Sequence, residues 1–399
     1  MSLNPRHEDQ IVSDRRKLHE NPEPSYQEFK TARFVADRLR FLGLEVKEGI
    51  GGTGVIALLR GRNCGKVVAL RADMDALPME EKTAEPFKST VKGMMHACGH
   101  DTHVAMLLGA ARILVDHKNE LKGSVKFIFQ PAEEAGGRGG AEPMIEDGVM
   151  QNPRVDYIFG LHIWAGLPSK VFGVKPGPFM ASSDFFKIRV VGKGGHGSAP
   201  HETVDPIFVA TKVIEAIYGM RARMIDPIEP LAISVCSVHS GTKSNIIPDD
   251  ATLEGTIRAL DEKTRTRVLK LTRQLVKSVC ASFGASCDIE FMPDANPVTR
   301  NDPRTTSRVF DVLKKLKGAR AVEMKPVLAG EDFSRFLELV PGTFYFLGTR
   351  NPKKGCVYPN HSSRFKVDEN VLKYGAESLA SLALEFANMG EMKSIETPS

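Results

Sequence analysis

Side chains that can bind a metal ion occur in four widely separated segments of this 399-residue chain, and this separation constrains the fold most. Cys98 and His100 stand close together, while Glu133-Glu134, His162 and His361 follow at long intervals. A thiolate, imidazoles and carboxylates together are ligands that a borderline-soft ion such as zinc accepts. If these residues share one site, the fold must bring His361 back to the first half of the chain.

The first half of the sequence alternates between helical and strand patterns. The expected helices span 8–19 and 26–42, a third begins just after His100-Asp101, and the expected strands span 67–73, 124–130 and 157–162. Such alternation predicts an α/β fold in which a mixed central sheet is flanked by helices.

A second pattern begins near residue 181. Four strand patterns (184–191, 231–238, 252–258 and 287–292) and two helical runs (205–219 and 262–283) predict a compact α+β sandwich. The first pattern then resumes, with a helix over 305–316, a strand over 343–347 and a final helix over 369–387. We therefore expect a metal-binding domain of residues 1–182 plus 294–399, interrupted by an inserted domain over 183–293.

Composition and charge argue against several classes of protein. The 54 basic and 49 acidic residues are interspersed, so the net charge of +5 does not predict nucleic-acid binding. The sequence shows no apolar run long enough for a signal peptide or a membrane span, so we expect a cytoplasmic protein without membrane contact. Six scattered cysteines without a CxxC pair do not resemble a disulfide framework.

The adjacent carboxylates Glu133 and Glu134 follow a predicted strand. Side chains of neighbouring residues leaving a strand point in different directions, so one carboxylate can bind a cation while the other accepts a proton from water. A solvated pair of loop glutamates is the simpler alternative, but the company of Cys98 and His100 favours a site. A hydrolase with a metal-activated water is therefore the leading hypothesis.

Structural alternatives exist for the other candidates in the first pattern. His162 could be a packed residue at a strand end, and His361 could be a surface residue in a polar loop. Asp73 and Asp75 close a predicted strand, where they could cap a helix or form a salt bridge to Arg71. None of these residues alone would indicate a metal site.

The second pattern contributes three further candidates. His196 lies among glycines, so its backbone can approach another surface closely, although an exposed turn histidine is the plain alternative. Asn245 and Arg258 could hold an anionic group, Arg258 through a bidentate fork, although an arginine on a strand is more often solvated.

Seven motifs in a fixed order resemble the zinc-dependent aminoacylase and carboxypeptidase family. The resemblance is to its amidohydrolase branch, with hippurate hydrolases, indole-acetyl-amino-acid hydrolases and thermostable carboxypeptidases, and it extends from Asn21-Pro22-Glu23 to His361. The motifs are LRADMDALPM, MHACGHDTH, FQPAEEAGGRGGA, GLHIWAGLP, GGHGSAPH, SGTKSNIIPDDATLEGTIR and AGEDFSRF.

The resemblance implies roles for the candidate residues. The implied metal ligands are Cys98, His100, Glu134, His162 and His361, with Cys98 as the bridge if two ions bind. Glu133 is the implied general base and proton shuttle, and His196 the implied oxyanion-stabilising residue, which a dimer could supply from its second copy. Asn245 and Arg258 are the implied binding residues for a substrate carboxylate.

The resemblance also implies a catalytic domain interrupted by a lid or dimerisation domain, and a homo-oligomer, either a dimer or a dimer of dimers. Its implied cofactor is Zn²⁺, with Co²⁺ or Mn²⁺ as substitutes, and its implied substrates are N-acyl amino acids or short peptides. Many relatives carry His-x-Asp where this chain has Asp73-Met74-Asp75, and aspartate in place of Cys98. This departure leaves open whether one or two ions bind.

Two other functions remain open at this point. A non-catalytic, zinc-stabilised interaction protein would use the same ligands without turnover. A hydrolase with Cys98 as its nucleophile and His100 as its base would leave Glu134, His162 and His361 unexplained.

Overall fold

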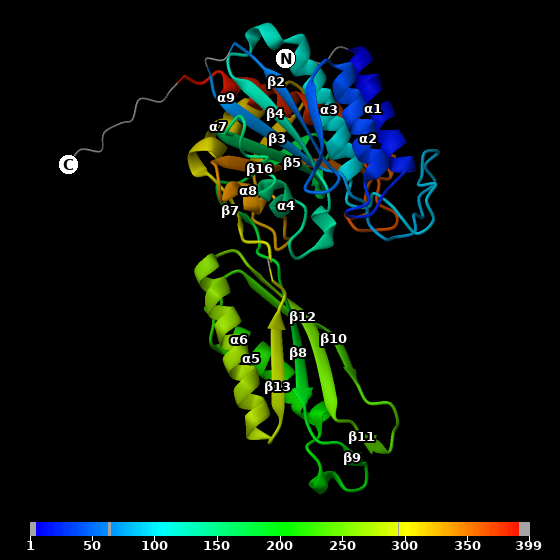
Figure 1. Ribbon diagram of the computed structural model, residues 1–399, viewed down its shortest axis with the longest axis vertical. Helices are drawn as coiled ribbons and strands as arrows, with labels where there is room; N and C mark the ends of the chain where they lie inside the picture. The colour runs from blue at the N-terminus through cyan, green and yellow to red at the C-terminus, as the bar shows by residue number, and fades with distance from the viewer. Residues whose placement is uncertain (1–4, 63–64, 294, 391–399) are drawn as a thin grey trace, which may run out of the picture. The chain divides into compact units, whose positions relative to one another are not determined.

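The computed structural model describes residues 5–62, 65–293 and 295–390 (Figure 1). The chain forms two compact units: Met1–Gly177, Arg300–Lys325 and Asp332–Ser399 make the first, and Pro178–Thr299 with Pro326–Glu331 make the second. The segment Pro326–Glu331 groups with the second unit although it lies outside the predicted range 183–293. The role of this second unit as a lid or dimerisation domain stays a prediction.

An eight-stranded mixed sheet forms the centre of the first unit. Its spatial order is β1 (Glu45–Ile50), β2 (Gly54–Arg60), β4 (Ser124–Gln130), β3 (Val67–Asp73), β5 (Tyr157–Pro168), β16 (Gly342–Arg350), β6 (Val171–Val174) and β15 (Arg320–Glu323). The four central strands β4, β3, β5 and β16 run parallel, and β2 and β6 are antiparallel to their neighbours β4 and β16. The predicted α/β class and mixed sheet are confirmed.

Helices of the first unit pack on this sheet and on each other (Figure 1). They are α1 (Pro5–Glu20), α2 (Phe29–Phe41), α3 (His100–Asp116), α4 (Ala141–Glu146), α7 (Pro303–Lys314), α8 (Ser334–Leu337) and α9 (Leu372–Ala387). α3 and α9 contact the central strands β3 and β5, and α1 packs against α3. Gly109 permits this close approach, because a Cβ atom there would lie 2.4 Å from the Ile11 side chain.

Two boundaries differ from the sequence prediction for identifiable reasons. The helix predicted from residue 26 begins at Phe29, because Tyr26 has a left-handed backbone with φ of 62° that a right-handed helix cannot include. The strand predicted to end at His162 continues to Pro168, where it still pairs with Arg350 of β16. His162 therefore lies inside a strand rather than at its end.

The second unit is a four-stranded antiparallel sheet with two long helices. The order is β10 (Leu231–Ser240), β12 (Asp250–Ala259), β8 (Asp184–Val191) and β13 (Ser286–Phe291), and the helices are α5 (Pro206–Arg223) and α6 (Glu262–Ser282). Residues of β12 alternate strictly between buried and half-buried, as expected when helices cover one face. Asp205 and Asp261 cap the two helices by accepting backbone N–H groups. The two predicted helices and the four predicted strands are all present among the described residues, and the short strands β9 and β11 are additional.

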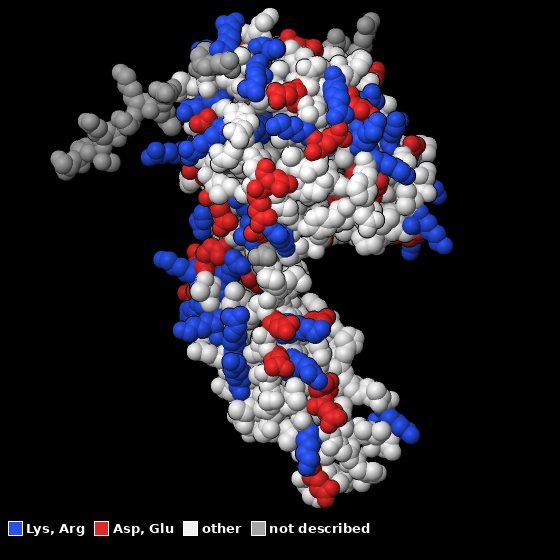
Figure 2. Space-filling model, viewed as in Figure 1, with Lys and Arg blue, Asp and Glu red and all other residues white. Residues whose placement is uncertain are grey.

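Two short strand pairings lie outside these two sheets. β9 (Gly195–His196) pairs with β11 (Ile246–Ile247) in the second unit, and β7 (Gly177–Met180) pairs with β14 (Thr299–Asn301). On the face that Figure 2 shows, lysines and arginines are mixed with aspartates and glutamates. None of the helices in the described part of the chain combines the length and apolar character that a membrane crossing requires.

Candidate metal centre

Three parallel strands of the first unit bring polar residues to one edge of the sheet. Asp73 ends β3 and pairs with Gln130, which ends β4, and His162 lies on β5 beside β3. Open sheets of this kind place ligand sites at the carboxyl ends of parallel strands. His100, the first residue of α3, joins this edge, because its Nδ1 lies 2.9 Å from the carbonyl oxygen of Asp75.

Two buried histidines each turn one ring nitrogen toward the other candidate ligands. Nδ1 of His100 lies 2.9 Å from the Asp75 carbonyl and 3.1 Å from its carboxylate, which leaves Nε2 buried without a hydrogen-bond partner. Nδ1 of His162 lies 2.6 Å from the carbonyl oxygen of Ile163, and its Nε2 faces Cys98. Metal-binding histidines are oriented in the same way, by a hydrogen bond from the ring nitrogen that does not bind the ion.

Cys98 lies at the centre of the candidate ligands. Its Sγ is 3.3 Å from Nε2 of His162 and 3.2 Å from Nε2 of His361, which in turn is 3.2 Å from Oε1 of Glu134. Two of the groups of donor atoms that lie within 4.8 Å of one another contain Cys98: Cys98 with His100 and His162, and Cys98 with Glu134 and His361. A further group joins His100 with Glu133 and Glu134. The structure thus brings all five predicted ligands together, in two groups that share Cys98.

Unusual backbone conformations hold these residues in place. Gly99 has φ of 94°, and a Cβ atom there would lie 2.2 Å from Ile163, so only glycine fits between Cys98 and His100. His361 has φ of 65°, and its N–H donates to the Ala97 carbonyl at 2.9 Å. A left-handed backbone costs energy for a residue other than glycine, so it is kept only where surrounding contacts hold it in place, often at functional sites.

The electrostatics of the site favour a bound cation. Burial, with the nearby carboxylate of Glu134, raises the pKa of the Cys98 thiol well above its usual range. Burial opposes charge on His100, but Asp73 and other carboxylates overcome it and raise the pKa of this ring to about 10. Burial lowers the pKa of His162 well below its usual range, so this ring is neutral and able to bind metal. A divalent ion would replace the proton on His100 as the partner of these carboxylates and would favour the thiolate.

Glu133 borders the ligand groups and is a candidate base. Its Oε2 lies 4.0 Å from Nε2 of His100, and its side chain is 11% exposed, whereas Glu134 reaches toward His361. The N–H of Glu134 donates to Oδ2 of Asp75 at 2.9 Å, which fixes where the pair of glutamates leaves its strand. Oε1 of Glu134 also lies 3.9 Å from Nε2 of His100, so both carboxylates border this ring, and the division of their roles stays a prediction.

Two residues near the site were missed by the sequence reasoning or read only in part. His103, three residues after His100 on the same helix face, contacts Asp73 through Nδ1 and accepts the N–H of Ile163 at Nε2. Both its nitrogens are used within the protein, so His103 supports the site rather than offering a ligand. Asp73 also forms the salt bridge to Arg71, at 2.7 Å, that was considered as its alternative role.

The other three predicted site residues lie in the second unit. His196 is exposed on β9, its Nδ1 is 2.7 Å from the Ser198 hydroxyl, and the carbonyl of Asn245 accepts the N–H of Gly197. His196 and Asn245 are therefore close neighbours. Arg258, on β12, stacks over the Phe185 ring at 5.0 Å, and no carboxylate of the described residues forms an ion pair with it.

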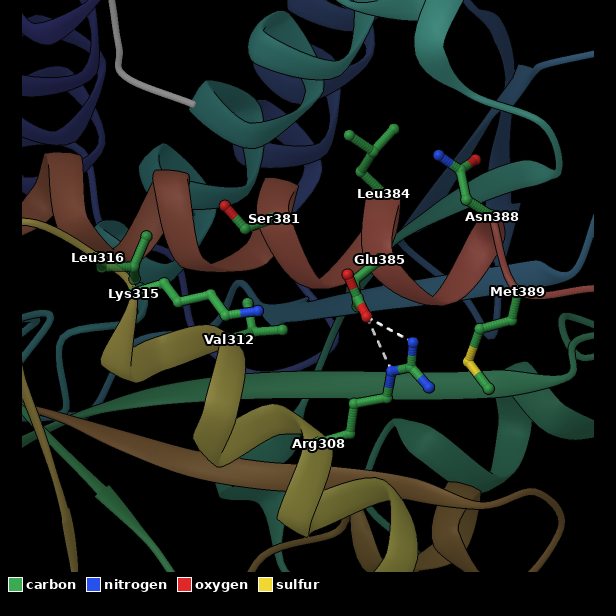
Figure 3. A pocket seen from close by; sticks show the side chains of 9 residues that line it. All are labelled: Arg308, Val312, Lys315, Leu316, Ser381, Leu384, Glu385, Asn388 and Met389. Carbon is green, nitrogen blue, oxygen red and sulfur yellow. Dashed lines mark hydrogen bonds and ion pairs between the residues drawn. The ribbon is translucent and has the colours of Figure 1, made fainter.

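A hollow elsewhere in the first unit lacks the cysteine and histidine ligands of the candidate metal centre. It has a volume of about 470 Å³ and lies between α7 and α9 (Figure 3). Its one carboxylate, Glu385, already binds Arg308 at 2.6 Å, and neither cysteine nor histidine lines it. This hollow is not a candidate metal centre.

Comparisons with known proteins agree with the geometry. The model of peptidase family M20/M25/M40 matches residues 69–385. The chain is 58% identical over 382 residues to thermostable carboxypeptidase 1 of Saccharolobus solfataricus, covering 96% of each chain, and 40% identical to hippurate hydrolase of Campylobacter jejuni, covering 93% of this chain and 95% of that one. The crystal structure of the YXEP protein of Bacillus subtilis, a dinuclear metal-binding peptidase from the M20 family, superposes with a TM-score of 0.83 at 35% identity, covering 96% of this chain and 99% of that one.

These matches decide between the functions that the sequence left open. The relatives are carboxypeptidases and amidohydrolases, so neither a non-catalytic interaction protein nor a cysteine-nucleophile hydrolase is favoured. The chain therefore belongs to peptidase family M20/M25/M40, and it is a metal-dependent hydrolase of amide bonds of the carboxypeptidase and amidohydrolase type.

Proposed function

We propose that the protein hydrolyses an amide bond next to a free carboxylate, in N-acyl amino acids or at the C-terminus of short peptides. The observation that carries this proposal is the convergence of five metal-ligand side chains with a sixth group, Glu133, beside them. The names of two relatives, carboxypeptidase and hippurate hydrolase, denote cleavage of such bonds. Arg258 also offers a cation that has no carboxylate partner among the described residues.

We assign two metal ions to the centre. Cys98, His100 and His162 would hold one ion, and Cys98, Glu134 and His361 the other, with the thiolate shared. Thiolate and imidazole ligands favour zinc, with cobalt or manganese as substitutes. When bound, such ions supply positive charge that polarises a carbonyl and lowers the pKa of water.

The residues of the chain then divide the remaining work. Glu133 accepts a proton from the attacking water and delivers it to the leaving amine, since it borders the ligands without being needed in either group. His196 donates a hydrogen bond to the developing oxyanion, from the same chain or from the second copy in a homodimer. Asn245 and Arg258 bind the substrate carboxylate. Cytoplasmic location and homo-oligomer formation stay predictions.

Matched substrates test the proposal. We would measure hydrolysis of a benzyloxycarbonyl amino acid and of its methyl ester, each before and after chelation and after restoration with zinc or cobalt. We expect cleavage of the free acid only, lost on chelation and recovered with metal. Equal turnover of acid and ester would contradict recognition of the carboxylate, and chelator-resistant turnover would contradict the metal assignment.

A further inference from the structure

The motif AGEDFSRF contains a buried carboxylate that the proposed function does not use. Asp332 is fully buried, and it is the first residue of the first unit after the segment Pro326–Glu331. Both of its oxygens accept hydrogen bonds from the Gln130 side chain, at 2.9 and 2.7 Å, and Oδ1 also accepts one from Arg71 at 2.8 Å. These partners lie at the ends of the two strands that lead to the metal centre.

The same carboxylate also holds the far end of the glutamate loop, residues 131–141. Oδ2 of Asp332 accepts the backbone N–H groups of Gly140 and Ala141, each at 3.1 Å. Gly139 makes this approach possible, because it has φ of 55° and a Cβ atom there would lie 2.5 Å from that oxygen. Asp332 thus joins the loop that carries Glu133 and Glu134 to the sheet beneath it.

Other contacts fix the beginning and middle of the glutamate loop. The N–H of Ala132 donates to Glu28 at 2.8 Å, and the N–H of Glu134 donates to Asp75 at 2.9 Å. The end of the loop is held by Asp332 and by the Tyr26 hydroxyl, which donates to the Gly139 carbonyl at 2.7 Å. Of these two anchors Asp332 is the fully buried one, and one of its carboxylate oxygens lies within 4.8 Å of one of Glu133.

Arg71 extends this arrangement to the residues that support the ligands. Its guanidinium donates to Gln130 at 2.8 Å and to Asp73 at 2.7 Å, as well as to Asp332. Asp73 in turn contacts His103, which accepts the N–H of Ile163 on the strand of His162. One continuous network therefore connects the glutamate loop with the residues that support the candidate ligands.

We propose that Asp332 is a positioning residue that clamps the glutamate loop to β3 and β4 and so sets the position of the base Glu133. The proposal rests on the proposed function for its catalytic consequence. The hydrogen bonds of Asp332 named above all come from donor groups. An asparagine at this position must therefore turn its amide N–H groups toward a donor. Asp332→Asn is therefore a change of equal size that disrupts the clamp without leaving a cavity.

Two variants test the clamp, and a third serves as the control. Asp332→Asn weakens the anchor directly. Gly139→Ala places a Cβ atom against Oδ2 of Asp332 and so pushes the loop away, while every side chain of the buried network keeps its identity. The second variant protects the test if Asp332→Asn fails to fold. Asp302→Asn removes a carboxylate of the same unit that accepts the Thr305 N–H at the start of α7, a position where asparagine caps equally well.

Steady-state kinetics should separate positioning from binding. In both test variants we expect kcat to fall about 100-fold, with KM changed by less than about twofold because the substrate's ground-state contacts remain. The Asp302→Asn control should retain the kcat of the original protein. Unchanged kcat in both test variants would overturn the proposal.

Amide hydrogen exchange in metal-free protein supplies a readout independent of turnover. We expect faster exchange in both test variants within residues 131–147 and unchanged exchange in β3 and β5. Exchange that rises equally throughout the first unit, or that stays unchanged in the loop, would overturn the clamp. If the original protein hydrolyses neither test substrate, the proposed function fails. The exchange result still tests the clamp, because it does not depend on turnover.

Discussion

The candidate functional residues of the two units differ in how the protein holds them. In the first unit His100 is 0% exposed, Cys98 8% and His162 5%, and both buried rings have one nitrogen committed to an oxygen of the protein. His361 is the exception, because its side chain is 55% exposed, although its N–H donates to the Ala97 carbonyl. In the second unit His196 and Asn245 are exposed, and Arg258 has no carboxylate partner among the described residues. The buried ligands are held by the protein, whereas His196, whose Nδ1 faces Ser198, and Arg258 keep hydrogen-bonding groups for other partners.

Fixed, buried side chains and exposed, unpaired side chains suit different tasks. A metal centre requires ligand atoms fixed before the ion arrives, and a second layer of hydrogen bonds provides that order at the cost of burying charge. Recognition of a mobile substrate requires unpaired donors that can be satisfied only on binding. The following substitutions would break or sharpen the distinction.

Removal of the shared ligand should have the largest effect. Cys98→Ala takes one donor from both ligand groups, so we expect metal content to fall at both sites and turnover to be abolished. His361→Ala takes a donor from one group only and should leave about one ion per chain, if each three-donor group holds an ion by itself. Elemental analysis after dialysis measures both. Equal metal content in the two variants would contradict the sharing of Cys98.

Removal of the proposed base should leave the metal in place. We expect Glu133→Gln to lower kcat by about 10²- to 10⁴-fold, the usual contribution of a general base, with metal content unchanged. Kinetics and elemental analysis on the same preparation provide the measurement. Glu134→Gln is the matched comparison, because it should lose metal as well as activity. A Glu133→Gln variant with near-full activity would refute the assignment.

A buried ion pair beside the centre should make the first unit sensitive to acid. Burial raises the pKa of Asp101, but Arg15, at 2.8 Å, and His19, at 2.9 Å, overcome it and hold this pKa well below its usual range. Because the folded-state pKa is depressed, the stabilisation is present above the unfolded value of about 3.9 and is lost as pH falls below it. Asp101→Asn should therefore cost about 3–5 kcal/mol near pH 5.5 and less near pH 3.

Denaturant unfolding of chelator-treated protein at the two pH values measures this difference. His19 is protonated in both states across that range, since its folded pKa is raised, so the change reports on Asp101. Asp9→Asn, at an exposed position of α1, is the control and should change the unfolding free energy little at either pH. A cost for Asp101→Asn that does not depend on pH would argue against the ion pair.

The smallest effect is expected in the second unit, where the residues are not part of a buried network. Arg258→Ala should raise KM for the free acid by an amount equivalent to about 1.5–3 kcal/mol, typical of hydrogen bonds to charged groups, and should leave stability nearly unchanged. Arg189→Ala, on neighbouring β8 and paired with Asp250, is the control. A loss of kcat without a change in KM would place Arg258 in a different role.

Much of the fold could be read from local patterns. The strands predicted over 67–73, 124–130 and 184–191 match β3, β4 and β8. An apolar run indicates a strand buried on both faces, and a strict alternation indicates a strand buried on one face. Eight strands of the described residues were not predicted. Six of them, β6, β7, β9, β11, β14 and β15, are only two to four residues long and pair with segments distant in sequence rather than showing a pattern of their own. The other two, β1 and β2, are longer and pair with each other as a hairpin.

The sequence by itself determined the types of ligand present, the pairing of Glu133 with Glu134, and the need for His361 to return to the first half of the chain. Residue chemistry and strand ends were enough for that. Only the tertiary structure decided that Cys98 is shared between two groups, that His103 is fully used, and that Asp332 anchors the glutamate loop. These facts depend on distances between atoms far apart in the chain, which burial and backbone geometry set and which no local pattern encodes.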